Sequence, residues 1–342
     1  MRFALVSQDK AHGARFRINP FEGDATGFMN WVDVWQGYHF SFANLREDMS
    51  ILRHFDVVMF SGNPHNFRDI VNIAEFLKPT KTVTMFYPEG SAQLYDNSIN
   101  GFEMEIYDAW NACDVLSIAE EDKKAYYEAF VDSGKTIVRF IHVPMRREMD
   151  GMGFFAQRVE KERQCALVYG DNNPNHPLIA IAAAARCGLS VMAVDCNRGK
   201  ANKIQQLFRS TEFFHVGKLG QFHFLNLMRT CYVSFYPTEW IGTARHQISC
   251  AVTGTPCIGN HDSHTQRRLF PDLGCDIYDI DRMADLFEIL KNDGVYEGIA
   301  SRARKAVEFY SLDNTCKRFL AAVGDAERMK EKNRIHAVGV EA

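Results

Sequence analysis

The sequence predicts an α/β protein made of two Rossmann-like domains. Short apolar strands and helices alternate from Phe3 to Val143, the pattern lapses, and a second alternating series begins at Ala166. Several strands, such as the run DVVMF that ends at Phe60, are apolar without interruption, as expected for strands covered on both faces. The chain has 342 residues, 46% of them hydrophobic, which suffices for two cores of about 150 residues each.

The first domain is predicted to span residues 1–150. Its strands alternate with helices expected near residues 67–78, 100–112 and 121–133, which indicates parallel strands joined by crossover helices. Between Pro144 and Arg163 the pattern gives way to a stretch that contains Met, Gly and Arg, which we interpret as the connection between the domains. The expected strands are Phe3 to Ser7, Val57 to Ser61, Thr82 to Tyr87, Val115 to Ala119 and Thr136 to Val143.

The second domain is predicted to span residues 151–310 and to repeat this alternation. Helices are expected near residues 178–187, 200–208 and 222–228, and a further helix ends at Gly254. Residues 311–342 are expected to form a final helical segment. The expected strands are Ala166 to Tyr169, Val191 to Val194, Phe213 to Val216, Tyr232 to Tyr236, Cys257 to Gly259 and Asp276 to Ile280.

Composition narrows the class of protein. The net charge of −4 gives no sign of an average nucleic-acid-binding surface, although a local patch remains compatible with it. The nine cysteines are scattered without a CxxC pair and fall in apolar patterns, which predicts buried thiols in a reducing compartment. The amino terminus lacks the apolar core of a signal peptide, and no run approaches the length of a membrane span. We therefore expect a cytoplasmic protein.

The stretch YVSFYPTEWIGTARHQISCAVTGTPCIG, residues 232–259, carries the clearest functional signal. It contains a strand, a loop with Glu239, a helix that ends at Gly254, and a second strand. In a parallel sheet such loops lie at the carboxyl ends of the strands, where ligands bind, and the following helix directs unpaired N–H groups at anions. A carboxylate in this place can accept hydrogen bonds from sugar or ribose hydroxyls.

The order of strand, P-T-E, glycine, helix, G-T-P and strand resembles the donor-site segment of GT-B glycosyltransferases. The likeness is to the large retaining family that includes the glycogen- and sucrose-type synthases, a group 1 or family 4-like pattern, and its order extends over roughly residues 110–320. The resemblance implies two Rossmann-like domains with a cleft between them, and a carboxyl-terminal segment that crosses back to the first domain. It also implies a hexosyl- or pentosyltransferase that uses a nucleotide sugar and needs no cofactor and no essential metal.

The resemblance assigns donor-binding roles around this loop. Glu239 would accept hydrogen bonds from donor hydroxyls, while Arg245 and His246, together with N–H groups near Gly242 and Thr243, would face the phosphates. The alternative for Arg245 is a solvated helix residue.

Three glycine turns add further donor-binding candidates. Gly170 and Gly217 follow predicted strands of the second domain, and Lys218 lies beside the second of these glycines. In the first domain, Gly13 and Arg15 follow the first strand, and in relatives a glycine loop at this place faces the donor phosphate. A basic surface turn is the alternative interpretation of that last pair.

The chain departs from the family pattern in two places. Relatives carry a second acidic residue, about eight positions after the first, that holds the nucleotide ribose. In this chain the corresponding position is Gln247 when counted forward from Glu239, or Ser249 when counted back from Gly254, and neither is acidic. Relatives also carry an Arg and a Lys near the first turn of the donor domain, where this chain has asparagines and His176. Both departures affect the expected donor.

The catalytic carboxylate is expected after the strand TVTMFYPEG of the first domain. Glu89 is the first choice, as a base or an orienting group, and Asp96 is the second. Each could instead be an ordinary loop carboxylate. The histidines are too scattered in sequence to predict a metal site.

Several functions remain open at this stage. The leading prediction is transfer of a sugar to an acceptor hydroxyl, and the acceptor could be a glycan, a small molecule, a protein or a hydroxylated DNA base of the kind that viral glycosyltransferases modify. A GT-B epimerase or phosphorylase is a second enzymatic possibility. A protein that kept the nucleotide- or sugar-binding cleft and lost catalysis is the alternative from a different class.

Overall fold

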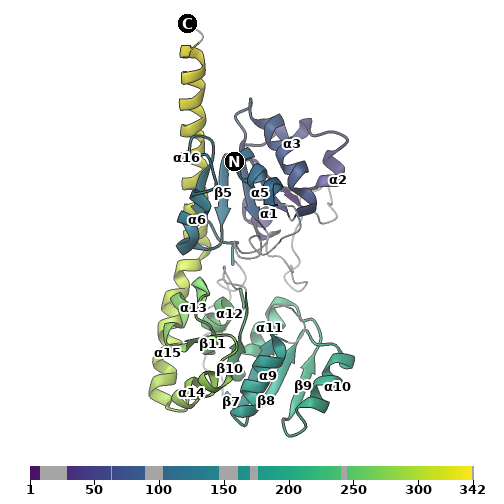
Figure 1. Cartoon of the computed structure of the whole chain (residues 1–342), viewed down its shortest axis with the longest axis vertical. Coiled ribbons are helices and arrows are strands. Elements are labelled where there is room, and N and C mark those ends of the chain that lie inside the picture. The colour runs from purple at the N-terminus through teal and green to yellow at the C-terminus, as the bar shows by residue number, and fades with distance from the viewer. Residues whose placement is uncertain are drawn as a thin grey trace. The chain divides into compact units, whose positions relative to one another are not determined.

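The computed structural model describes residues 1–7, 29–62, 64–88, 103–145, 161–169, 176–239 and 245–340. These residues form two compact units (Figure 1). One unit contains the described residues up to Pro144 together with the segment that begins at Leu312, and the other contains Met145 and the described residues up to Ser311. The predicted connection at residues 144–163 begins where this division falls, and residues 146–160 lie outside the described part of the chain.

The first unit is built on a six-stranded parallel sheet with strand order β2-β1-β3-β4-β5-β6. All strands predicted from the sequence are present within a few residues. A short edge strand was missed, because its four residues YHFS are half polar and only alternately buried. The strands are β1 (Phe3–Ser7), β2 (Tyr38–Ser41), β3 (Val57–Gly62), β4 (Val83–Pro88), β5 (Val115–Ile118) and β6 (Ile137–Phe140).

Helices of the first unit bury the apolar face that their sequence spacing predicts. In α3, Phe67, Ile70 and Leu77 recur at helical spacing and are buried, and this helix packs against α5. The helix expected at residues 121–133 is shorter than predicted and begins with a 3₁₀ turn, Glu121–Lys123. The helices are α1 (Met29–Trp35), α2 (Phe42–Leu45), α3 (Phe67–Leu77), α5 (Glu103–Ala112), α6 (Lys124–Glu128) and α16 (Leu312–Val340), with further 3₁₀ turns at Ser50–His54 and Pro64–Asn66.

The second unit is built on another six-stranded parallel sheet, with strand order β12-β11-β10-β7-β8-β9. The prediction of a strand at residues 276–280 is wrong. Asp279 instead caps a helix by accepting a hydrogen bond from the Arg282 N–H, and the last strand lies just before it. The strands are β7 (Glu162–Tyr169), β8 (Ser190–Val194), β9 (Phe213–Val216), β10 (Cys231–Tyr236), β11 (Cys257–Asn260) and β12 (Gly274–Cys275).

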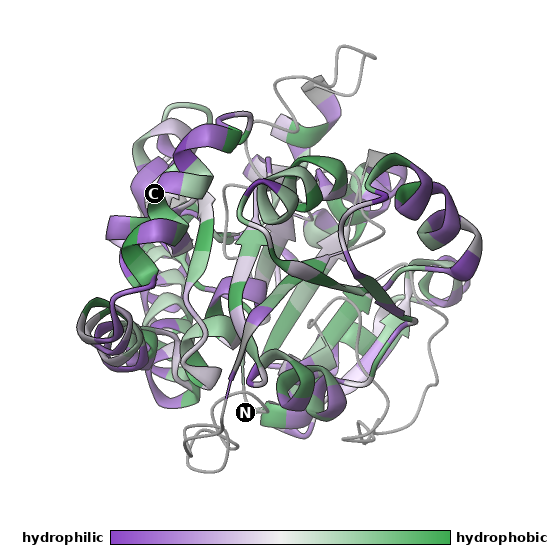
Figure 2. Cartoon of the chain, turned by 90° about the horizontal axis from the view of Figure 1, so that it is seen from below, coloured by the Kyte–Doolittle hydropathy of each residue, from purple (hydrophilic) through white to green (hydrophobic). Residues whose placement is uncertain are grey.

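The helices of this unit flank the sheet and enclose an apolar core. In α9 the small residues Ala180, Ala183 and Ala184 are buried, which allows close packing against α14 and the strands. Strands of both sheets are largely hydrophobic, while the helices carry hydrophilic residues on one side (Figure 2). The helices are α9 (Pro177–Arg186), α10 (Arg198–Leu207), α11 (Gln221–Met228), α12 (Arg245–Thr253), α13 (His264–Leu269), α14 (Ile280–Leu290) and α15 (Asp293–Ala306), with 3₁₀ turns at Pro271–Leu273 and Val307–Tyr310.

The long helix α16 belongs to the first unit although it ends the chain. Its Phe319 is fully buried, with the ring centroid 4.9 Å from that of Trp31 and 5.9 Å from that of Phe3. Arg139 of β6 donates two hydrogen bonds, of 3.1 and 2.7 Å, to one carboxylate oxygen of Asp325. Apolar burial and this ion pair together attach the helix to the sheet of the amino-terminal residues.

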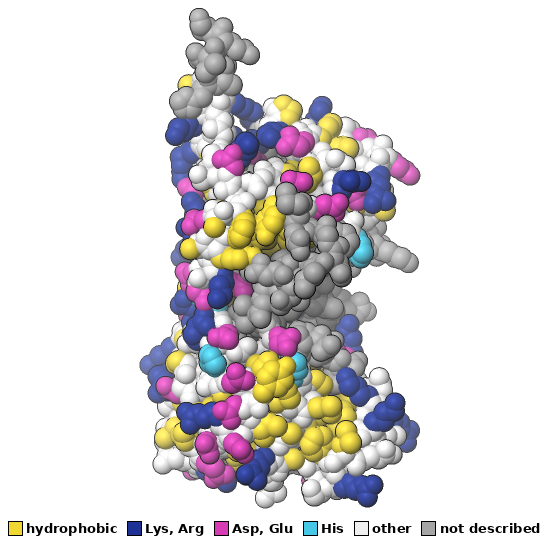
Figure 3. All heavy atoms as spheres, viewed as in Figure 1, with side chains coloured by type: hydrophobic (Ala, Val, Ile, Leu, Met, Phe, Trp, Pro, Cys, Tyr) yellow, Lys and Arg dark blue, Asp and Glu magenta, His cyan; other side chains and the backbone are white. Residues whose placement is uncertain are grey.

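The distribution of surface charge and the burial of the cysteines agree with what the composition predicts. On the face shown in Figure 3, basic and acidic side chains are interspersed over both units, as expected for a net charge of −4. All nine cysteines lie in the described part of the chain; none of them forms a disulfide, and seven are buried. Within the described residues, no helix is both long and apolar enough to cross a bilayer.

Replacing Phe319 by Ala should destabilise the first unit by about 3 to 5 kcal/mol, because it opens a cavity between α16 and the sheet. Urea unfolding followed by circular dichroism would measure the loss. Leu320→Ala is the matched control, since the neighbouring Leu320 side chain is 49% exposed and should change stability little. Equal effects of the two substitutions would contradict this account of how α16 is held.

Candidate functional site

The carboxyl-terminal edge of the second sheet has one position that the topology favours for a ligand. After β7 the chain moves outward to β8 and β9, and it then returns to β10 on the other side of β7. The strand order therefore reverses between β7 and β10, which pair directly. Ligands of open α/β sheets bind outside the carboxyl ends of the strands at such a switch point.

Two polar side chains meet at this switch point. Glu239 follows β10 in the sequence, and His176 precedes α9, the helix after β7. A carboxylate oxygen of Glu239, Oε1, lies 3.0 Å from Nε2 of His176. The Glu239 side chain is 51% exposed and the His176 side chain 18%, so the carboxylate is open to solvent while the imidazole is largely covered. The pair can offer a charged acceptor beside a group that becomes cationic on protonation.

Local backbone geometry places the histidine. His176 has φ = +42°, a left-handed conformation, and Pro177 begins α9 immediately afterwards. Pro177 has no N–H, and the N–H groups of Ile179 and Ala180 donate to the His176 carbonyl, at 3.0 and 3.2 Å. On its other side the ring lies 5.6 Å, centroid to centroid, from the exposed ring of Tyr278. The sequence analysis identified His176 only as a residue that stands where relatives have a cation. Its contact with Glu239 follows from the pairing of β7 with β10.

Arg245 lies at the same edge, at the start of α12. Burial raises the pKa of Tyr169, the last residue of β7, and the negative charge of Asp195 raises this pKa further, while the positive charge of Arg245 lowers it. Arg245 begins α12, the helix that follows β10, and β10 pairs with β7 at the switch point. The structure thus places Arg245 close to the switch point, at the amino end of a helix, where a cation and N–H groups can act together on an anion.

A pocket adjoins this group of residues. It has a volume of about 590 Å³, begins at His176 and Pro177, and continues between α9 and α10. Lys200 and Lys203 contribute cations to its wall, and Leu178, Ile204 and Leu207 are among its apolar lining. This mixture of apolar surface and a few charges is typical of small-molecule sites.

His246 points into the interior of the unit, in contrast to the expectation that it faces donor phosphates. It is 6% exposed, its ring stacks on that of Tyr236 at 4.4 Å, and Nε2 lies 2.7 Å from the hydroxyl of Ser234. The reason is that α12 is enclosed on all sides, because every residue from His246 to Thr253 is buried.

Gln247 and Ser249, the two positions where relatives would have a second acidic residue, are buried as well. Gln247 donates from Nε2 to Oε1 of Gln266 at 2.9 Å, and Gln266 in turn donates to main-chain carbonyls, including that of Cys257 at 2.9 Å. Ser249 is 1% exposed. Both side chains are part of the internal packing of α12, so neither is placed to hold a ribose at the surface.

The remaining sequence candidates divide into two groups. Gly217 and Lys218 follow β9 and are exposed, and a Cβ added at Gly217 would meet no atom within 4 Å, so a ligand could approach its backbone closely. The other candidates lie outside the described residues: Gly13, Arg15, Glu89, Asp96, Gly170, Gly242 and Thr243.

Comparison with known proteins identifies the fold. No protein-family profile matches the sequence, and no curated protein matches it either. Solved structures do match. A UDP-forming α,α-trehalose-phosphate synthase from Burkholderia vietnamiensis superposes with a TM-score of 0.70 at 12% identity, over 95% of this chain and 97% of that one. The Anabaena protein HepE in complex with UDP gives 0.65 at 9%, over 95% and 100%.

A third similar structure is the E. coli trehalose-6-phosphate protein bound with UDP-2-fluoro glucose, with a TM-score of 0.65 at 9% identity, over 94% of this chain and 99% of that one. These neighbours are GT-B glycosyltransferases. The fold predicted from the order of strands and helices is confirmed: the chain has the GT-B fold, with two Rossmann-like sheets.

Proposed function

We propose that this protein is a glycosyltransferase that moves a sugar from a nucleotide sugar to an acceptor hydroxyl. The observation that carries the proposal is the position of Glu239 and His176 together at the point where the strand order of the second sheet reverses. The fold adds support, since structures similar to almost the whole chain hold UDP or UDP-2-fluoro glucose. A uridine nucleotide sugar is therefore the first donor to test.

The proposed chemistry assigns the residues complementary tasks. Glu239 accepts hydrogen bonds from hydroxyls of the donor. Arg245 and the imidazolium form of His176 face the diphosphate that leaves. During transfer, the bond between the anomeric carbon and the phosphate oxygen breaks, a bond to the acceptor oxygen forms, and the acceptor proton passes to a base. We propose that these groups neutralise the diphosphate without a bound divalent metal.

The base is proposed from the sequence. Glu89 is the next residue after β4, and Asp96 is the second candidate. A glycan, a small molecule, a protein and a hydroxylated DNA base all remain candidate acceptors, since each offers a hydroxyl. Location in the cytoplasm likewise stays a prediction.

A non-catalytic nucleotide- or sugar-binding protein is the second candidate function. The specific observation in its favour is that Gln247 and Ser249 are both buried, so neither can replace the second acidic residue of the family. Incubation with a panel of nucleotide sugars, followed by measurement of released nucleoside diphosphate, separates the two functions. A binding protein would show a thermal shift with a donor and release no nucleotide, with or without an acceptor.

Glu239→Gln should weaken donor binding by about 1.5 to 3 kcal/mol, because the neutral amide is a weaker acceptor for the donor hydroxyls than the carboxylate. Isothermal calorimetry with the nucleotide sugar that gives the largest thermal shift would measure the change. Glu212→Gln is the matched control, since Glu212 is exposed and precedes β9 at the opposite edge of the same sheet. Wild-type affinity in Glu239→Gln would remove this residue from the donor site.

Glu89→Gln should leave donor affinity near normal and lower turnover by about 100-fold or more, the usual contribution of a positioned base. Steady-state nucleotide release and calorimetry on the same preparation would measure both quantities. Glu75→Gln, on the exposed face of α3, is the control. Turnover at the wild-type rate would exclude Glu89 and make Asp96 the next residue to test.

A further inference from the structure

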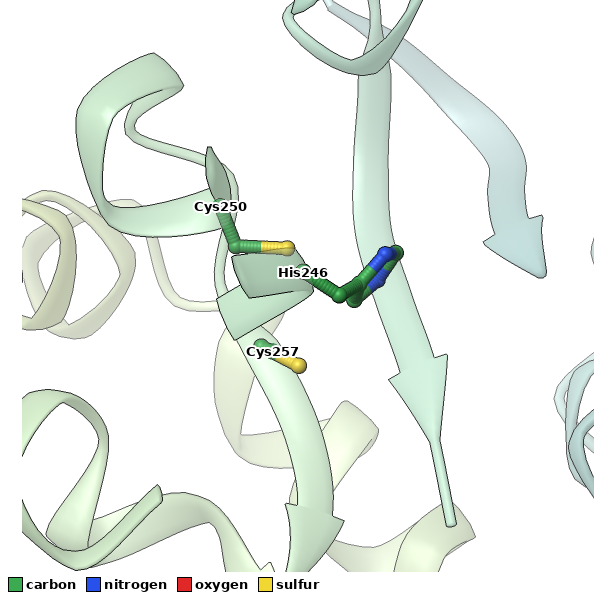
Figure 4. Close-up of side chains that lie close together, drawn as sticks. All are labelled: His246, Cys250 and Cys257. Atoms are coloured by element: carbon green, nitrogen blue, oxygen red, sulfur yellow. The ribbon is translucent and has the colours of Figure 1, made fainter. Parts of the chain in front are cut away.

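Three buried side chains with metal-binding atoms gather inside the second unit (Figure 4). His246 and Cys250 lie four residues apart on one face of α12, and Cys257 begins β11. One ring nitrogen and the two sulfurs all lie within 4.8 Å of one another. His246 is 6% exposed and the two cysteines are 0% exposed. It is the one such group of three among the described residues.

The imidazole of His246 is held in place and has one nitrogen available. Its ring stacks on Tyr236, and Nε2 is hydrogen-bonded to the hydroxyl of Ser234 at 2.7 Å. The other nitrogen, Nδ1, is buried and has no hydrogen-bond partner. An unpaired polar atom in an apolar interior costs free energy, whereas metal-binding histidines characteristically anchor one ring nitrogen and offer the other to the ion.

The two thiols differ in how readily they ionise. Burial raises the pKa of Cys250, but the nearby Cys257 and His246 lower it to about 5. Burial and the neighbouring Cys250 raise the pKa of Cys257 well above its ordinary value.

We propose that His246, Cys250 and Cys257 bind one Zn²⁺ ion. Binding would release the thiol protons, and Zn²⁺ with two thiolates and a neutral imidazole has no net charge, which suits an apolar interior. Zinc–sulfur and zinc–nitrogen bond lengths place tetrahedral ligand atoms about 3.5 to 3.8 Å apart, so the ligand atoms need to approach one another by at most about 1 Å. The fourth position would take a hydroxyl or a water.

The proposed ion is structural and goes beyond the glycosyl transfer. It would join the first two turns of α12 to β11 and so fix the start of the helix, where Arg245 lies next to His246. Because its three ligands are buried, the ion cannot contact a substrate at the surface. Transfer without a metal at the diphosphate and a buried zinc site are therefore compatible.

The chain provides a matched control. The sulfurs of Cys165 and Cys231 lie 3.9 Å apart on β7 and β10 of the same sheet, and both residues are buried. No histidine completes a group of three ligands around this pair within the described residues. Substitution here perturbs the core in a comparable way and leaves the proposed ligands intact.

The test measures metal in the full-length protein, purified without a metal-affinity step. After unfolding, a chromogenic chelator should find about one zinc per chain in the wild type. Cys250→Ser and Cys257→Ser should reduce this to background, and Cys165→Ser should retain it. Adding Co²⁺ to chelator-treated wild-type protein should produce the near-ultraviolet absorption of cobalt–thiolate bonds, which Cys250→Ser should lack.

Background zinc in the wild type together with no cobalt–thiolate absorption would overturn the proposal and leave the cluster as ordinary core packing. Equal loss of metal in Cys165→Ser and Cys250→Ser would overturn it as well. Should the variants not fold, the wild-type zinc content and cobalt spectrum decide the question alone. Nucleotide release is a separate measurement, so failure of the zinc site does not affect the proposed transferase function.

Discussion

Parallel pairing of β7 with β10 is the constraint on which the candidate site depends. From Val233 onward these strands pair regularly, with Val233 opposite Ala166 and Phe235 opposite Val168. The intervening β8 and β9 lie on the other side of β7. Parallel strands end at the same edge of a sheet, so residues far apart in sequence emerge side by side. The contact between His176 and Glu239, at 3.0 Å, is a direct result of this pairing.

Helix α12 shows how one short element divides its residues between two tasks. Arg245 begins the helix, whereas the residues from His246 to Thr253 are buried. The buried part satisfies its polar groups internally, most clearly through Gln247 and the main-chain carbonyls bound by Gln266. A residue of this helix can therefore reach a ligand only from the first turn, which limits the groups available for recognising a donor.

The first unit is stabilised by a helix that the chain supplies last. Phe319 of α16 fills a site between Trp31 and Phe3, and Lys330 donates to both the Thr82 carbonyl, at 2.8 Å, and the Asp114 carboxylate, at 3.2 Å. The core of this unit therefore includes contacts between its first and last elements. Loss of the carboxyl-terminal residues would remove part of that core as well as surface.

The sequence by itself determined that the protein contains two α/β units, each built on a parallel sheet. Uninterrupted apolar strands and helical periodicity are local properties. The strands of both sheets except β2 and β12, the place where the alternation restarts and the position of Glu239 after β10 could therefore be predicted from the residues. The strand β2 was not predicted because it has only four residues, and its buried positions are the polar His39 and Ser41.

Tertiary structure alone decided which side chains share a site. Sequence spacing placed His246 beside Arg245 as a phosphate ligand, but the orientation of α12 directs it into the core against Tyr236 and Ser234. The meeting of His176 with Glu239 depends on strand order, and the approach of Cys257 to His246 and Cys250 depends on how α12 packs on β11. Both arise from long-range packing of apolar surfaces, which a local pattern does not contain.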